Sequence, residues 1–371
     1  LSLEVVNHAA PAVVISIGWL GFLFGLRFMP AQLREMPVEH RVAVAVEPLV
    51  TFALLAGMLL VAERVLDVDF RLSTIGALAA VGSGTTKSGL AWAAGRFGIK
   101  GNLSAMLQSV ARLNDLPGVL IIAVYFAFRA PHLFDPPSVN LWAMLGITLV
   151  GGLLLAVLMA LLLGRDALRE DLAWVAVLGF AALGTGLSVR LGISALTVTT
   201  LMGVALGWFC RHAEPIARMT EGTERPIVQV LLVLIGAQLE LDPTTVLVAI
   251  GITLLRAVAK LGAGASLWAL RLPSARGSPW LGVGLLHSGG VVTVMVLSFA
   301  LALKGPEVQL ILWTFVLFSL AGDLMGSPAL KSLLAWHGQL PSGPGAEPSN
   351  EAPPPPPTAT FAAGGNGSAT G

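Results

Sequence analysis

Long apolar stretches recur along this chain, separated by short segments rich in charged residues and proline. A helix that crosses the hydrocarbon core of a bilayer needs about 20 apolar residues, and most of these stretches approach or exceed that length. Only 12% of the residues are charged, whereas a soluble protein usually has about 25%. The sequence therefore predicts an all-α polytopic membrane protein. We expect about 11 transmembrane helices, over residues 9–26, 43–62, 72–95, 102–128, 140–164, 171–189, 192–210, 226–240, 244–270, 279–303 and 307–329.

The loop charges and the C-terminal composition set the expected topology. Most loop Lys and Arg residues follow alternate spans, starting with the first, and loops of this kind face the cytoplasm. This places the C-terminus in the cytoplasm. Residues 1–337 form the predicted transmembrane domain. Residues 338–371 are rich in Pro and Gly, which predicts a disordered cytoplasmic tail. Nothing in the sequence suggests a nucleic-acid partner, so membrane lipid is the expected environment.

Asp115 lies near the middle of the apolar stretch 102–128. A carboxylate at that depth in a bilayer costs about 2.5 kcal/mol or more, and such groups usually bind a cation, carry a proton or pair with a fixed charge. Asp115 follows Asn114 and precedes Leu116-Pro117-Gly118. The sequence therefore predicts an ion or proton site at Asp115, or a structural ion pair with Lys260 or Arg112.

Two of the expected spans contain runs of small and hydroxyl residues at mid-membrane depth. Span 72–95 contains residues 81–89, Val-Gly-Ser-Gly-Thr-Thr-Lys-Ser-Gly, and span 279–303 contains residues 286–293, Leu-His-Ser-Gly-Gly-Val-Val-Thr. Such runs let a helix unwind where neighbours satisfy its backbone, and paired interruptions in two halves of a chain indicate a transporter ion site. The residues expected at the two interruptions are Gly84, Ser288, Gly289 and Gly290.

The two halves of the chain share a common order of features. Each interrupted span is followed by a span with an aspartate, in Asp115-Leu116-Pro117-Gly118 and in Asp323-Leu324-Met325-Gly326. The two runs of four spans begin on opposite sides of the membrane, which predicts an inverted repeat.

With these motifs, the chain resembles the monovalent cation/proton antiporters, in the branch of bacterial sodium/proton and potassium/proton exchangers. The resemblance rests on residues 21–26, Gly-Phe-Leu-Phe-Gly-Leu, on both interrupted spans, on Asn114-Asp115 and on Arg256 to Gly262. It implies an inverted-repeat fold with two crossing discontinuous helices. Within that fold, the spans in 43–128 and 244–329 would form the ion-binding core, those in 9–26 and 171–240 a scaffold, and 140–164 a linker helix.

The resemblance also implies a function. The protein would be a transporter rather than an enzyme, and it would need no cofactor. Asp115 would bind a transported Na⁺ or K⁺ and H⁺ in alternation, assisted by oxygens of Asn114, Thr85 and Thr86. The family has more helices than this chain, so we expect two N-terminal helices to be missing by truncation. They would belong to the scaffold that forms a homodimer in the inner (plasma) membrane.

Four basic residues are candidate counter-charges to the site: Lys260, Arg256, Arg112 and Lys87. Lys260 matches the family's basic residue opposite the aspartate. Arg256 has the alternative of pairing with Glu47 or Asp323. Lys87 departs from the family pattern, since a second ammonium beside the site would repel a bound cation or pair with Asp115.

Two other functions remain open at this stage. One is a sodium-coupled symporter of an organic solute with related crossover architecture, which needs a roomy polar cavity between the interrupted helices. The other is an inactive membrane scaffold, which Lys87 and the missing helices allow.

Overall fold

The computed structural model describes residues 3–66, 70–86, 101–129, 140–163, 170–210, 213–272, 279–303 and 305–336. All regular elements in these ranges are helices. The first half contains α1 (Leu3–Leu26), α2 (Pro30–Glu35), α3 (Val38–Leu66), α4 (Leu72–Ser83), α6 (Asn102–Leu113), α7 (Leu116–Arg129) and α8 (Leu141–Leu163). The second half contains α9 (Glu170–Leu191), α10 (Ala195–Phe209), α11 (Ala213–Thr220), η2 (Glu221–Thr223), α12 (Glu224–Ala237), α13 (Pro243–Ala269), η4 (Pro279–Leu285), α14 (Gly290–Ala302) and α15 (Pro306–Trp336).

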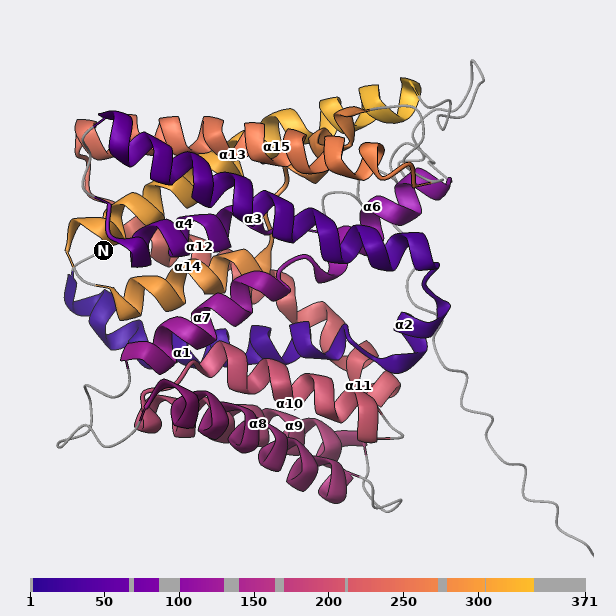
Figure 1. Cartoon of the computed structure of the whole chain (residues 1–371). Helices are drawn as coiled ribbons and strands as arrows, with labels where there is room; N and C mark the ends of the chain where they lie inside the picture. Colours follow the sequence, from indigo (N-terminus) through magenta and orange to yellow (C-terminus); the bar gives the residue numbers. More distant parts are fainter. Residues whose placement is uncertain are drawn as a thin grey trace, which may run out of the picture.

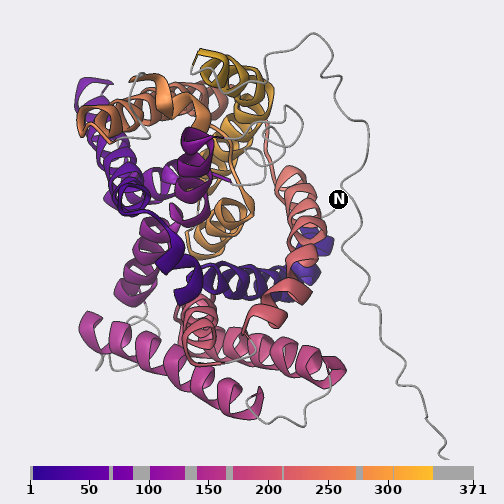
Figure 2. The same ribbon diagram turned by 90° about the vertical axis from the view of Figure 1, so that its right-hand side faces the viewer.

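The helices form two groups joined through α1, α7 and α14. In Figure 1, α3, α13 and α15 lie together at the top, and α8, α9 and α10 lie together at the bottom. Helix α1 packs along α10, and α3 packs against α4 and α13. The same separation is visible after a quarter turn in Figure 2. The expected assignment of these groups to a core and a scaffold remains a prediction.

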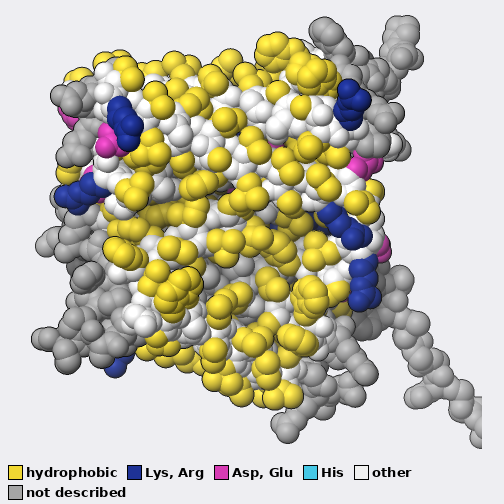
Figure 3. Space-filling model, viewed as in Figure 1, with side chains coloured by type: hydrophobic (Ala, Val, Ile, Leu, Met, Phe, Trp, Pro, Cys, Tyr) yellow, Lys and Arg dark blue, Asp and Glu magenta, His cyan; other side chains and the backbone are white. Residues whose placement is uncertain are grey.

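The outer surface is apolar over most of its area. Large hydrophobic side chains such as Val65, Trp142 and Leu161 point outward. Figure 3 shows hydrophobic side chains across the face between Lys and Arg residues near its left and right margins. Such a surface would be unstable in water and matches the hydrocarbon core of a bilayer. The chain is thus a multi-pass membrane protein.

Six helical segments in the described ranges are long and apolar enough to cross a bilayer, and the bent pair of η4 and α14 makes a seventh. The segments Ala10–Leu26, Leu72–Ser83 and Ala195–Phe209 are apolar but shorter. Helix α12, with 14 residues, is also short. The expected number of about 11 spans therefore stays a prediction, and so does the inverted repeat. The tail 338–371 lies outside the described residues.

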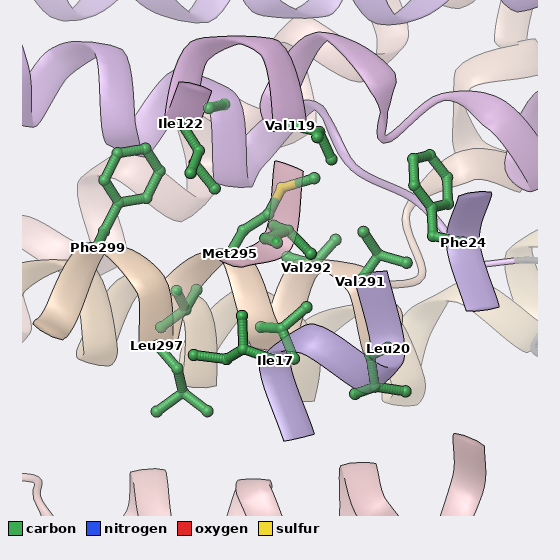
Figure 4. Packing of buried hydrophobic residues seen from close by; sticks show 14 of the residues in the cluster. Ile17, Leu20, Phe24, Val119, Ile122, Val291, Val292, Met295, Leu297 and Phe299 are labelled. Atoms are coloured by element: carbon green, nitrogen blue, oxygen red, sulfur yellow. The ribbon is translucent and has the colours of Figure 1, made fainter. Parts of the chain in front are cut away.

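Helix α14 is held at the junction of the two groups by apolar packing. Its residues Val291, Val292 and Met295 are fully or almost fully buried. Figure 4 shows these side chains between Ile17, Leu20 and Phe24 of α1 and Val119 and Ile122 of α7. The interrupted span in the second half of the chain thus begins its second helix next to the segment that carries Asp115.

Candidate functional site

The segment that follows α4 and the bend between η4 and α14 lie together, as the resemblance implied. Helix α4 ends at Ser83, and Gly84 after it is extended (φ −65°, ψ 152°). The axes of η4 and α14 differ by 71°, and Gly289, just before α14, is also extended. The backbone N–H of Thr86 donates to the carbonyl of His287 (3.2 Å). The Thr85 hydroxyl donates to the carbonyl of Leu285 (2.9 Å). The described ends of the two broken helices are therefore hydrogen-bonded to each other.

Asp115 lies at a third interruption, which the sequence reading did not include. Residues 102–128 form one long apolar segment, as expected, but within it α6 ends at Leu113 and α7 begins at Leu116. Pro117 has no backbone N–H, so the carbonyl of Leu113 loses the donor that a continuous helix would provide. At this break, Asp115 lies outside regular helical structure and faces the crossing of the interrupted helices.

The Asp115 carboxylate is enclosed by this crossing. Its side chain is 1% exposed. A Cβ atom on Gly84 would lie only 2.7 Å from Asp115 Oδ1 and would also overlap Val292. Within the described residues, Oδ1 has no hydrogen-bond partner. The site thus holds a buried carboxylate oxygen against the extended backbone that follows α4, and this packing requires a glycine at position 84.

Asn114 fixes the end of α4. Its Oδ1 accepts a hydrogen bond from the backbone N–H of Thr85 (3.1 Å), and its Nδ2 donates to the carbonyl of Ser83 (3.3 Å). The side chain is fully buried. Both ends of the amide are therefore engaged with the interrupted helix. Asn114 positions the backbone beside Asp115, which differs from the direct ion ligand expected from the sequence.

Lys260 enters the site from α13 and pairs with a residue that sequence reasoning did not assign to the site. Its ammonium is 2.9 Å from Glu47 Oε1, and both side chains are 0% exposed. It also donates to the hydroxyl of Thr85 (2.8 Å) and to the carbonyl of Ser83. Among the described residues, the ion-pair partner of Lys260 is Glu47, whereas the sequence suggested Asp115.

Glu47 was expected near the start of its span and lies well inside α3, which begins earlier, at Val38. Its Oε1 also accepts a hydrogen bond from Thr51, one turn further along the helix (3.0 Å). A carboxylate and an ammonium in separate apolar spans each need an oppositely charged partner. This need was the available sequence signal for the ion pair between Glu47 and Lys260. The presence of several buried cations left the pairing undetermined.

Arg256 holds the two broken helices together through their carbonyl groups. Its guanidinium donates to the carbonyls of Gly82 (2.9 Å) and Gly84 (3.1 Å) at the end of α4, and to that of Leu286 (3.0 Å) after η4. The group also lies over the ring of Phe318, 4.4 Å from its centroid. The carbonyls at a helix C-terminus lack internal donors and carry partial negative charge, which suits a guanidinium. The proposed pairing with Glu47 or Asp323 is replaced by these contacts.

The remaining candidates contact other residues than Asp115 or lie outside the described residues. Arg112 donates to Gln32 Oε1 (3.0 Å) on α2, so it does not serve as the expected partner of Asp115. The Ser288 hydroxyl bonds to that of Ser319 on α15 (2.6 Å). Gly290 begins α14, and a Cβ atom on it would meet Val228 and Glu224 of α12. Lys87 lies outside the described residues.

Comparison with solved structures identifies the fold. No model of a known protein family matches the sequence, and no curated protein matches it. The structure is similar to that of the sodium proton antiporter MjNhaP1 from Methanocaldococcus jannaschii at pH 8, with a TM-score of 0.59 and 19% sequence identity. The similarity covers 90% of this chain and 85% of the other. The chain therefore has the fold of this solved antiporter.

Proposed function

We propose that this protein is a secondary antiporter that exchanges a monovalent cation, Na⁺ or K⁺, for H⁺, and that the two ions compete for Asp115. The observation that carries the proposal is the buried Asp115 carboxylate, whose Oδ1 is packed against the extended backbone at Gly84. A burial this complete is costly for a carboxylate unless its charge is compensated. A bound cation and a bound proton are two alternative ways of compensating it.

The ligands for a cation would be oxygens around Asp115. A monovalent cation that has lost water needs several oxygen ligands, and Asp115 Oδ1 is one. Thr85 and Thr86 lie in the extended segment after α4 and carry both carbonyl and hydroxyl oxygens. Protonation of Asp115 would remove the charge that holds the cation, so the two ions would exclude each other. The direct contact between the interrupted helices at Thr86 and His287 favours a small ion over an organic solute.

The buried charges around the site support one-for-one exchange. Four ionisable side chains are buried around the site, the carboxylic acids Asp115 and Glu47 and the bases Lys260 and Arg256. Because Lys260 is engaged with Glu47, Asp115 is the carboxylate left to exchange its ion. One cation or one proton at Asp115 then gives the same net charge. A current driven by a cation gradient at zero membrane potential would contradict this stoichiometry.

The setting of this activity follows from the resemblance and the loop charges. We infer a homodimer in the inner membrane, with the C-terminus in the cytoplasm and a role in pH homeostasis. The part of the chain around Asp115 would move against the remaining helices, so that the site opens to each side in turn.

The activity is tested with the full chain in vesicles that contain a pH-sensitive dye. After a pH gradient is formed, Na⁺, K⁺ or Li⁺ is added outside, and the recovery of fluorescence reports proton movement. We expect recovery with at least one of these ions. Competition for Asp115 further predicts that the cation concentration needed for half-maximal exchange rises as the pH falls. No recovery with any ion, from pH 6 to pH 9 (about the range over which such groups are expected to titrate), would contradict antiport.

A further inference from the structure

A polar cavity of about 210 Å³ opens at the end of the bundle that carries α2 and α11. It has room for several water molecules, since one needs a space of about 15 Å³ by the same measure. Its lining includes five charged side chains: Arg27, Arg112, Glu214, Arg218 and Glu224. Neither the sequence motifs nor the proposed site accounts for this cavity.

Two of these residues, Arg27 and Glu224, form an ion pair in the wall of the cavity. One nitrogen of Arg27, Nη2, lies 2.9 Å from Glu224 Oε1 and 2.8 Å from Oε2. The side chains are 12% and 26% exposed, so the pair remains reachable from the cavity. Arg27 follows α1, and Glu224 begins α12. Next to the pair, Trp19 of α1 donates to the hydroxyl of Thr223 (2.8 Å) and ties the same two segments together.

Glu224 also reaches the helix crossing. A Cβ atom on Gly290, the first residue of α14, would lie 3.0 Å from Glu224 Oε1. Gly290 directly follows Gly289, which packs against Thr86 in the segment beside Asp115. Glu224 thus lies between the cavity and the buried site.

We propose that Glu224 is a first binding station for the transported cation, and that Arg27 competes with the cation for it and so gates the passage to Asp115. With the pair closed, its charges cancel, and the cavity is separated from the site. When Arg27 releases Glu224, the carboxylate faces the water in the cavity and can bind a cation. The N-terminus of α14 attracts the same carboxylate, so a shift of α14 would change how strongly Glu224 is held. This inference rests on the proposed antiport function.

The two residues of the gate give opposite predictions. In Glu224→Gln the first station loses its charge, and the cation concentration at half-maximal exchange should rise about tenfold, the effect of one charged contact. In Arg27→Gln the competitor is lost, and the same concentration should fall by a similar factor. A pair that only stabilises the fold would shift both variants in the same direction. Matched controls are Arg71→Gln and Glu307→Gln, which break an ion pair of 3.1 Å elsewhere on the protein. Neither control should change the half-maximal concentration.

The experiment measures Na⁺- and K⁺-driven proton exchange in vesicles for the wild type, these four variants and Asp115→Asn. Opposite shifts in the two gate variants support the gate. Shifts in the same direction, or none, overturn it. If Glu224→Gln does not fold, Arg27→Gln alone tests the gate. A cation concentration at half-maximal exchange that does not fall in Arg27→Gln contradicts competition between Arg27 and the cation. A wild type without exchange, or an Asp115→Asn variant with normal exchange, would instead overturn the antiport function itself.

Discussion

The ammonium of Lys260 is hydrogen-bonded to Glu47, at 2.9 Å, inside a site whose other carboxylate is Asp115. Both partners are completely buried, one on α13 and one on α3. The pair links two helices from opposite halves of the chain and engages a basic residue that also donates to the hydroxyl of Thr85 after α4. The ion pair therefore does not include Asp115, and we propose that Asp115 is the carboxylate that exchanges the ions.

Removal of Glu47 should destabilise the protein strongly. Breaking a buried ion pair by removing one partner costs about 3–5 kcal/mol, because it leaves a buried charge without compensation. We expect Glu47→Gln to lower the midpoint of thermal unfolding in detergent. The double variant Glu47→Gln with Lys260→Met should recover much of the loss, since it leaves no unpaired charge. A single variant as stable as the wild type would contradict the pairing.

Gly84→Ala should impair transport, because the added methyl group would occupy the space between Asp115 Oδ1 and Val292. Gly76→Ala, on the helix α4 that ends just before Gly84, is a matched control, since a Cβ atom at Gly76 has no neighbour within 4 Å. Alanine also favours a helix over glycine by about 1 kcal/mol, so the control should be as stable as the wild type or more stable. Exchange rates of both variants in vesicles check this expectation. Equal rates would show that position 84 does not limit the site.

Arg256→Lys should loosen the crossing although the charge is kept. A lysine ammonium cannot reproduce the planar fork that contacts three carbonyl groups and lies over Phe318. Each lost hydrogen bond to a charged group costs about 1.5–3 kcal/mol. We expect a lower unfolding temperature and slower exchange. Arg190→Lys, at an exposed position on α9, serves as the control and should match the wild type.

The first turn of α13 should weaken in acid. The hydroxyl and the backbone N–H of Thr245 donate to Asp242 Oδ2 (2.6 and 2.8 Å), and these hydrogen bonds lower the pKa of Asp242 below its usual 3.8. A carboxylate whose pKa is lowered by folding stabilises the folded state above its unfolded pKa, and this contribution is lost as the pH falls through the folded value. Hydrogen exchange at the Thr245 amide, taken relative to its intrinsic rate at each pH, should therefore become faster below pH 3.8 in the wild type. In Asp242→Ala it should be fast at neutral pH as well. Protection that does not change with pH would contradict this cap.

The sequence predicted the framework of the site because its signals are local. Glycine and hydroxyl runs marked both interrupted spans, and a lone carboxylate in an apolar stretch marked Asp115. Pairings between distant helices carry no such signal. The sequence suggested Asp115 as a partner of Lys260 and Glu47 as a partner of Arg256, whereas the packing of α3 against α13 brings Glu47 to Lys260. The break at Asn114 was missed because Pro117 can be accommodated in a membrane helix with or without an interruption.

The exchange activity of Asp115→Asn tests the central claim most directly. The substitution keeps the size of the side chain and removes its charge and its titrating proton. The full chain with this single change is placed in vesicles, and proton movement driven by Na⁺ and by K⁺ is compared with that of the wild type at matched protein levels. We predict that exchange is lost while the protein remains folded. Exchange at the wild-type rate would contradict the assignment of Asp115 as the shared site of cation and proton.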